Sequence, residues 1–419
     1  MPGVDYPRRL RVNKAELSAR IQRAPQEGGL AKNGDVQRSV GAGGECAGGR
    51  VLILTADAGL GHRSAAEAVA KALRIQCPSD WQIDIANPLD DHRVPALLRE
   101  GQSGYDELVR RAPELYRLGY EVSDSAAGAA VIDSALTVML FRVLLDALKT
   151  YRPDIIVCTH PLYQAPLKAI ADTDGKRARL ITVVTDLATV HGVWFNKAAD
   201  VLAVPTEAVS KLAVAHGFPA ERVRVTGLPV DPSLADAPRD VRALRADLGW
   251  DPDLPTFLVV GSRRLTRLPE MLRAVNHSGL GLQLILMAGD DQALRASYDE
   301  TEWHLPVRKY GFVDRMPTFM HAANGIISKA GGLIVSESLA CGLPMILVRA
   351  LPGQEVGNAE YVVEGGAGDV AHDALALLET LYHWLADDGA LLATRAANAC
   401  RLGRPRAALE VADLVLGLL

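Results

Sequence analysis

The stretch that decides the fold runs from Ser328 to Gly368: SKAGGLIVSESLACGLPMILVRALPGQEVGNAEYVVEGGAG. It follows the end of a short apolar strand and begins with a tight glycine turn. The pattern predicts a helix over 333–341, ended by Gly342 and Pro344, and a second strand over 345–348. A strand, a glycine turn and a helix N-terminus together make an anion site, because backbone N–H groups and the helix dipole point the same way. We therefore expect a phosphorylated ligand in front of this helix.

Polar side chains surround the expected anion site. Glu337 lies one turn into the helix. Gln354 and Asn358 belong to a polar loop, 352–358, which follows the next strand and leads into another helix. Carboxylate and amide groups of this kind suit the hydroxyls of a ribose and a sugar.

Composition limits the class of protein. The 419 residues suffice for two or three domains at about 150 residues each. A net charge of −5 argues against a nucleic-acid partner. Five scattered cysteines with no CxxC pair predict a reducing, cytoplasmic compartment and no structural zinc. We see no signal peptide, and no apolar run of roughly 18 residues that predicts a membrane span.

The chain begins with a Gly- and Arg-rich extension over residues 1–49, which we expect to be flexible. The first core strand, 51–55, then leads through a glycine loop into a helix and a second strand, which is the start of a parallel doubly wound sheet. Residues 105–120 combine apolar side chains with arginines, which fits either a surface for an anionic membrane or a solvated helix.

The glycine loop 56–64 contains Gly59, Gly61 and His62. One interpretation is a plain strand-to-helix turn with an incidental histidine. A second is a dinucleotide fingerprint, although the third glycine of that motif is missing. The interpretation that we favour is an acceptor-binding loop in which His62 acts as a general base, because an imidazole has a pKa near neutrality.

Polar residues repeatedly follow the predicted strands of the first half. His160 follows the third strand, Asp186 follows the fourth, and His191 and Trp194 come soon after. Open α/β sheets bind their ligands at the carboxyl ends of parallel strands. We therefore place Asp186, His191 and Trp194 among the candidate ligand contacts, with Trp194 as either a ligand wall or a core residue.

A Pro-rich turn at 227–232 reads as a linker, after which strands and helices alternate again. This predicts two α/β domains with doubly wound parallel sheets and a cleft between them, over residues 50–232 and 233–400. The last segment, 401–419, is a helix with an apolar face that has no partner in its own half, so we expect it to cross back to the first domain.

Four stretches carry a resemblance to a known family: ADAGLGHRSAAEAVAKAL, VVTDLATVHGVWFNKAADVLAVPTEAV, VTGLPVDPSL and the opening stretch. Together they resemble monogalactosyldiacylglycerol synthases and processive bacterial diacylglycerol glucosyltransferases. Those are inverting, metal-independent enzymes of the GT-B fold, a pair of Rossmann-like domains facing a cleft. The resemblance covers roughly residues 51–368.

The resemblance implies a role for each candidate residue. It implies that the N-terminal domain binds the acceptor, with His62 as the catalytic base and Gly59, Gly61, Asp186, His191 and Trp194 at the acceptor. It implies that the C-terminal domain binds a UDP-hexose through Gly261, Ser262, Arg263, Gly311, Phe312, Val313, Lys329, Gly331, Gly332, Glu337, Gln354, Glu355 and Asn358. No cofactor and no metal is expected, since the UDP-sugar is a co-substrate.

Three positions depart from the family pattern. Leu60 replaces the middle one of three glycines before the histidine, and Ile334 stands where bacterial relatives often carry threonine. Arg263 and Arg264 stand in a loop that is glycine-rich in relatives. These arginines are suited to clamp phosphate, or they mark a changed or lost donor site.

The sequence thus predicts transfer of a hexose from a UDP-sugar to a lipid acceptor such as diacylglycerol, in the cytoplasm at the inner face of the cell membrane. Three alternatives stay open. The acceptor is instead polyprenyl-linked or a soluble small molecule; the protein binds a nucleotide or a lipid without turnover; or the first loop binds NAD(P) in an oxidoreductase.

Overall fold

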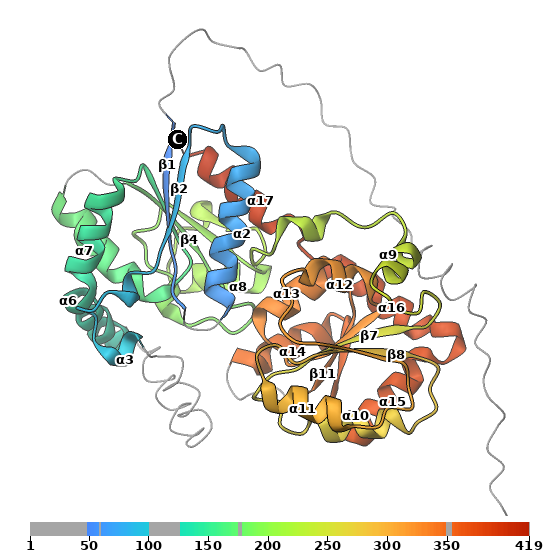
Figure 1. Ribbon diagram of the computed structural model, residues 1–419. Coiled ribbons are helices and arrows are strands. Elements are labelled where there is room, and N and C mark those ends of the chain that lie inside the picture. The colour runs from blue at the N-terminus through green and yellow to red at the C-terminus, as the bar shows by residue number, and fades with distance from the viewer. Residues whose placement is uncertain (1–47, 58–59, 100–125, 175–177, 349–353, 419) are drawn as a thin grey trace, which may run out of the picture.

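The computed structural model describes residues 48–57, 60–99, 126–174, 178–348 and 354–418. The predicted extension 1–49 lies almost wholly outside the described residues, as do Gly59 and the stretch 105–120. Figure 1 shows two lobes, each built on a twisted sheet with helices on both faces. The prediction of two doubly wound parallel-sheet domains is confirmed.

The first domain contains a six-stranded parallel sheet in the order β2-β1-β3-β4-β5-β6. Its strands are β1 Arg50–Leu54, β2 Gln82–Ala86, β3 Ile155–Cys158, β4 Arg179–Val183, β5 Val201–Val204 and β6 Val223–Val225. The helices are α2 Leu60–Gln76, α3 Ala96–Arg99, α6 Ala126–Tyr151, α7 Gln164–Asp174 and α8 Glu207–Ala215. Short 3-10 turns are η1 Pro88–Asp90, η2 Pro161–Tyr163, η3 Gly192–Trp194, η4 Ala220–Arg222 and η5 Pro232–Ala235.

The second domain repeats this design in the strand order β12-β11-β10-β7-β8-β9. Its strands are β7 Thr256–Val260, β8 Gln283–Met287, β9 Val307–Tyr310, β10 Gly325–Ser328, β11 Met345–Val348 and β12 Gly368–Ala371. The helices are α9 Val241–Asp247, α10 Leu268–Asn276, α11 Gln292–Glu300, α12 Met316–Ala322, α13 Gly332–Ala340, α14 Gln354–Glu364, α15 Ala374–Leu385 and α16 Ala390–Leu402, with η6 at Asp387–Gly389.

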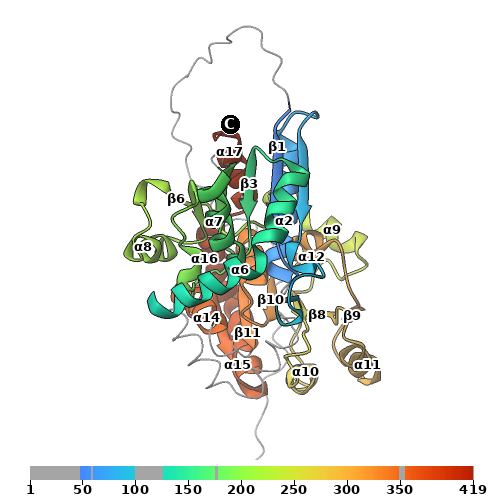
Figure 2. The same cartoon turned by 90° about the vertical axis from the view of Figure 1, so that its left-hand side faces the viewer.

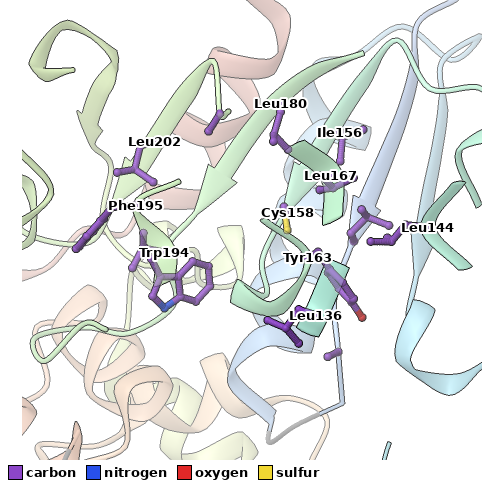
Figure 3. Packing of buried hydrophobic residues seen from close by; sticks show 14 of the residues in the cluster. Leu136, Leu144, Ile156, Cys158, Tyr163, Leu167, Leu180, Trp194, Phe195 and Leu202 are labelled. Carbon is purple, nitrogen blue, oxygen red and sulfur yellow. The ribbon is translucent and has the colours of Figure 1, made fainter. Parts of the chain in front are cut away.

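Both faces of the first sheet are buried, which explains why its strands read as continuous apolar runs. Leu52 and Leu54 of β1 face a cluster formed with α6, α7 and α8, whereas Val51 and Ile53 face α2. Figure 2 shows α6 and α7 in front of the first of these faces, and Figure 3 shows its packing around Tyr163 and Trp194.

The last helix, α17 (Ala407–Leu416), packs on the first domain although it follows the second domain in the chain. Its side chains Val411 and Val415 are fully buried in the cluster that also contains Val69 and Leu73 of α2. Gln76 of α2 donates a hydrogen bond to Asp413 at 3.2 Å. The chain therefore crosses between the domains twice, once near η5 and once before α17 (Figure 1).

The structure corrects one local prediction near the opening stretch. The sequence predicted a polar loop over 352–358, but α14 already begins at Gln354. Glu355 and Asn358 therefore lie three residues apart on a helix and share one face, and both are buried. Two short strands, β6 and β12, were not predicted as strands at all.

Candidate active site

Each sheet has one point where the strand order reverses, and the candidate residues gather at these two points. In the first sheet the reversal lies between β1 and β3, which are followed by the loops that carry His62 and His160. In the second sheet it lies between β7 and β10, which lead to Gly261 and Lys329. Ligands of open α/β sheets bind in the crevice at such a point.

The two crevices meet through the loop that follows β4. A Cβ atom added at Gly332, the first residue of α13, would lie 3.7 Å from the carbonyl oxygen of Thr185 and 3.7 Å from the Cβ of Leu187. A Cβ at Gly357 of α14 would lie 2.2 Å from the Thr189 hydroxyl. The absent side chains of these two glycines allow the first domain to touch the helix starts of the second.

His62 is the third residue of α2, and its ring is held by groups from two other loops. Its Nδ1 atom lies 3.0 Å from the carbonyl oxygen of Thr159 and 2.6 Å from the hydroxyl oxygen of Thr185. A carbonyl oxygen only accepts hydrogen bonds, so Nδ1 carries the ring proton. The other nitrogen, Nε2, then carries a lone pair and is able to take a proton.

The surroundings of His62 keep the ring neutral. Burial lowers the pKa of His62 to about 4, and the hydrogen bond to the Thr159 carbonyl opposes this only in part. The His160 ring stands edge-on at 4.7 Å between centroids, and burial lowers its pKa well below the usual value as well. At neutral pH both rings are therefore uncharged and each carries a single N–H proton, which is the state that a general base requires.

Asp186 and Trp194 form a pair beside His62. Trp194 lies 6.2 Å from His62 between ring centroids, and its indole N–H donates to the Asp186 carboxylate at 2.7 Å. Burial raises the pKa of Asp186 to about 6, and the indole hydrogen bond acts in the opposite direction. Of the two roles considered for Trp194, its complete burial matches the core residue, and its indole N–H holds Asp186 in place.

The other predicted acceptor residues differ in their surroundings. His191 caps η3, where its Nδ1 accepts a hydrogen bond from the Val193 backbone at 3.1 Å. Its ring therefore has a structural role at this turn. Gly61 faces open space, since a Cβ atom there would meet nothing within 4 Å.

The N-terminus of α13 is the place where the sequence predicts an anion site. Gly331 precedes it in an extended conformation, and no side chain in the described part of the chain caps this helix end. The first N–H groups of the helix are therefore available to a ligand. The Lys329 side chain is close by, with its ammonium nitrogen 3.1 Å from where a Gly331 Cβ would lie.

The predicted sugar contacts are engaged with the protein itself. The Lys329 ammonium lies 2.5 Å from the Glu355 carboxylate, and Arg264 lies 3.9 Å from the same carboxylate. The Asn358 amide donates to the carbonyl oxygen of Ala330 at 3.0 Å. The buried face of α14 thus holds the glycine turn through Glu355 and Asn358. These two side chains can contact a sugar, as the sequence predicts, only if they give up these hydrogen bonds.

Glu337 lies where α13 approaches α2 and the linker. Burial raises the pKa of Glu337 to about 7, and the nearby Asp231 carboxylate adds to this effect. Asp231 in turn accepts hydrogen bonds from the Lys71 ammonium at 2.7 and 3.0 Å. A carboxyl group that is close to half protonated at neutral pH is suited to bind hydroxyls as donor or acceptor.

The remaining donor-side predictions fall into a packed part and an exposed part. Gly261 is packed: a Cβ there would lie 2.2 Å from Leu294 and 2.9 Å from the Met287 carbonyl. Arg263 is exposed, whereas Arg264 reaches the Lys329–Glu355 pair. Phe312 is 70% exposed, as a ring that stacks on a base requires. Gly311, Ser262 and Val313 are each partly buried beside these residues.

Sequence reasoning did not select two groups that the structure brings next to His62. These are the Thr185 hydroxyl and the His160 ring. His160 follows β3, which borders the reversal point, and Thr185 follows β4, the neighbour of β3, so their position in the strand order was the available signal.

The residues that the structure describes contain no group of three or more His, Cys, Asp or Glu side chains placed to hold a metal ion. Nor does any helix among them combine the length and the apolar character needed to cross a bilayer.

Comparisons with solved structures show the fold, and a family model adds the class. The chain aligns with MurG of Acinetobacter baumannii at a TM-score of 0.56 and 17% identity, over 88% of this chain and 99% of that one. It aligns with the UDP-GlcNAc 2-epimerase of Neisseria meningitidis at a TM-score of 0.56 and 14% identity, over 88% and 99%. The model for the glycosyltransferase family 28 C-terminal domain matches residues 256–408. The protein is a glycosyltransferase with the GT-B fold.

The particular family follows from the first domain. The monogalactosyldiacylglycerol (MGDG) synthase model matches residues 62–230. A probable monogalactosyldiacylglycerol synthase 3 from Oryza sativa subsp. japonica is 32% identical over 371 residues, which span 86% of this chain and 73% of the relative. The synthase of Spinacia oleracea is 32% identical, over 86% and 71%. The chain belongs to the monogalactosyldiacylglycerol synthase family, so the resemblance seen in the sequence is confirmed.

The relatives also correct one prediction. The cysteine pattern predicted the cytoplasm, and the lipid acceptor predicted the inner face of the cell membrane. The relatives from Oryza, Spinacia and Arabidopsis are all named as chloroplastic. The predicted location is therefore contradicted. Free cysteines indicate only a reducing compartment, so they could not distinguish the cytoplasm from the chloroplast.

Proposed function

We propose that this enzyme transfers a hexose from a UDP-sugar to the free hydroxyl of diacylglycerol, with inversion at the anomeric carbon. The names of its relatives make UDP-galactose the first donor to test. Diacylglycerol resides in a bilayer, so we further propose that the protein works at a membrane surface by peripheral association.

The observation that carries this proposal is the orientation of His62. With its Nδ1 proton directed at Thr159 and Thr185, the ring offers Nε2 to an incoming hydroxyl. In the proposed step Nε2 takes the hydroxyl proton while the acceptor oxygen attacks the anomeric carbon. The bond from that carbon to the diphosphate breaks, and UDP leaves with the electron pair. A single displacement of this kind inverts the configuration.

The leaving diphosphate is stabilised, in this proposal, by the start of α13 and by Lys329, without a metal ion. The uncapped N–H groups and the dipole of this nine-residue helix favour negative charge at its N-terminus. Lys329 then moves from Glu355 to the phosphate, a change that the 28% exposure of its side chain permits. We propose that Glu337 binds the ribose hydroxyls and that the Phe312 ring, which is 70% exposed, stacks on the uracil.

A UDP-release assay tests the proposal directly. The protein is incubated with diacylglycerol in mixed micelles and with UDP-galactose or UDP-glucose, with and without EDTA. We expect turnover with at least one donor, no loss with EDTA, and a glycolipid product of inverted configuration. Flotation with liposomes tests the membrane surface. Turnover only with a soluble acceptor, or UDP binding with no transfer, would sink the proposal.

The base is tested by the variant His62→Ala. We expect kcat to fall by about 10²- to 10⁴-fold, since that is the usual contribution of general-base catalysis. His92→Ala is a matched control, because His92 lies on the surface with a side chain that is 88% exposed. If His62→Ala keeps the turnover of His92→Ala, the base has been assigned wrongly.

A further inference from the structure

The shorter of the two hydrogen-bond contacts of the His62 ring comes from a threonine hydroxyl. Thr185 follows β4, is 7% exposed, and lies 123 residues from His62 in the chain. Its Oγ1 atom is 2.6 Å from His62 Nδ1, which is shorter than the 3.0 Å between Nδ1 and the Thr159 carbonyl. The same hydroxyl lies 3.4 Å from that carbonyl.

These three atoms form a closed set of hydrogen bonds. The Nδ1 proton of His62 is shared between the Thr185 oxygen and the Thr159 carbonyl, and the Thr185 hydroxyl donates its own proton to the carbonyl. The Thr159 hydroxyl in turn donates to the carbonyl oxygens of Leu54 and His62 at 3.3 and 3.2 Å. The ring is therefore held by the residues that follow β3 and β4, and the Thr159 hydroxyl links this set to the end of β1.

The loop that carries Thr185 is held from the other domain as well. The Thr185 carbonyl and the Leu187 side chain lie against Gly332 at the start of α13, and Thr189 lies against Gly357 of α14. Packing on both sides restricts the movement of Thr185. A hydroxyl held in this way selects one ring orientation and one tautomer, because only Nδ1–H satisfies both of its neighbours.

We propose that Thr185 is a positioning residue, which orients the His62 ring and fixes its proton on Nδ1 so that Nε2 meets the acceptor hydroxyl. It does so without a charge, in the place where many catalytic histidines have a carboxylate. When Nε2 takes up the acceptor proton, the threonine oxygen and the Thr159 carbonyl together stabilise the imidazolium. This inference rests on the proposed role of His62 as the base.

The test compares Thr185→Val, which keeps the shape but removes the hydroxyl, with Thr185→Ser, which keeps the hydroxyl but removes the methyl group. We expect Thr185→Val to lower kcat by about 10- to 100-fold with little change in the KM for the UDP-sugar, as for other residues that orient a catalytic group. Thr185→Ser should restore most of this loss. Equal losses in both variants would show that the methyl packing matters instead, and would overturn the inference.

A second measurement does not depend on turnover. The ¹⁵N shifts of labelled histidine report the tautomer and the pKa of His62, whose signal is identified by its absence in His62→Ala. We expect the Nδ1-protonated tautomer in the wild type, and in Thr185→Val a mixture of tautomers and a lower pKa, because the imidazolium loses an acceptor. An unchanged tautomer and an unchanged pKa would overturn the inference.

The double variant His62→Ala/Thr185→Val separates this inference from the proposed function. If Thr185 acts through His62, adding Thr185→Val to His62→Ala causes no further loss. If His62→Ala is inactive while Thr185→Val is fully active, the inference fails and the proposed function stands. If His62→Ala is fully active, the base assignment fails, whatever Thr185→Val does.

Discussion

The two crevices have the same place in two similar sheets but use opposite chemistry. In the first domain, His62 is held by a carbonyl and a hydroxyl, which are both uncharged. In the second domain, Lys329 is held by the Glu355 carboxylate, with Arg264 beside it. Uncharged hydrogen-bonding groups in a buried site fix the orientation of the ring that they hold. An ion pair, in contrast, contains a cation that can leave its partner and bind an anionic ligand.

This difference fits the two substrates that we propose. The hydroxyl of a lipid is neutral, and it needs a base in a fixed orientation. A nucleotide diphosphate is an anion, and it needs cations and N–H groups that are free to turn toward it. The first crevice is thus complete before any ligand arrives, and the second must exchange partners. Three predictions test this contrast, in order of decreasing effect.

The ion pair of the second crevice gives the largest expected effect on stability. In Lys329→Met the buried Glu355 carboxylate loses its ion pair with Lys329 and keeps Arg264 at 3.9 Å. We expect the free energy of unfolding, from urea titration, to fall by about 2 kcal/mol, below the usual range for a buried pair because Lys329 is partly exposed. The affinity for UDP, from calorimetry, should fall as well.

The matched control is the double variant Lys329→Met/Glu355→Gln, which removes both charges and keeps the volume. It should regain most of the lost stability but none of the lost UDP affinity. A loss below about 0.5 kcal/mol in the single variant would mean that the pair behaves as an exposed salt bridge. The contrast between the two crevices would then be wrong.

The Asp186 carboxylate of the first crevice gives the next largest effect. Trp194→Phe keeps a ring in the core but removes the N–H that donates to Asp186. We expect a loss of about 1 kcal/mol in unfolding free energy at pH 8, where Asp186 is charged. The loss should be smaller at pH 5, below its pKa of about 6, because a neutral carboxyl tolerates the missing donor.

Any cavity left by the smaller ring costs the same at both pH values, so the difference between them isolates the hydrogen bond. Trp384→Phe is a useful control, since this tryptophan is also fully buried and also donates to an aspartate, Asp369, at 2.8 Å. Asp369 has the Arg395 guanidinium at 2.7 Å as well. If the Trp194→Phe loss is the same at pH 5 and pH 8, Asp186 is not the charged group of this crevice.

The sequence predicted the sheets well because strands buried on both faces must be apolar throughout. It missed β12 and β6, whose sequences GDVA and VRV contain charged residues and, in β12, a glycine. It also placed the start of α14 too late, since Pro352 and Gly353 are strong turn signals. Such local signals could not show where the helix begins relative to the glycine turn.

The candidate site was predictable residue by residue but not as a set of contacts. His62 and Lys329 stood out because each follows a strand near a glycine turn. Their partners Thr185 and Glu355 lie 123 and 26 residues away, and only the strand order brings them together. Trp194 shows the same limit of the sequence. A tryptophan near a predicted site can line a ligand pocket or belong to the core, and only the packing shows that it is completely buried.

The smallest expected effect is the pH dependence of stability, because His62 and Glu337 change the stability with opposite signs. The pKa of His62 is lowered from 6.5 to about 4, so the unfolded chain binds a proton that the folded chain does not, and this contribution to stability is lost as pH falls from about 6.5 toward 4. The pKa of Glu337 is raised from 4.5 to about 7, so its contribution is lost as pH rises from about 4.5 toward 7. Between pH 5 and 6.5 the two slopes have opposite signs. Relative to the wild type, urea titrations of Glu337→Gln should show unfolding free energies that rise with pH by about 1 kcal/mol per unit, and those of His62→Gln should fall by a similar amount. Slopes of the same sign in both variants would show that His62 and Glu337 do not change the stability in opposite directions.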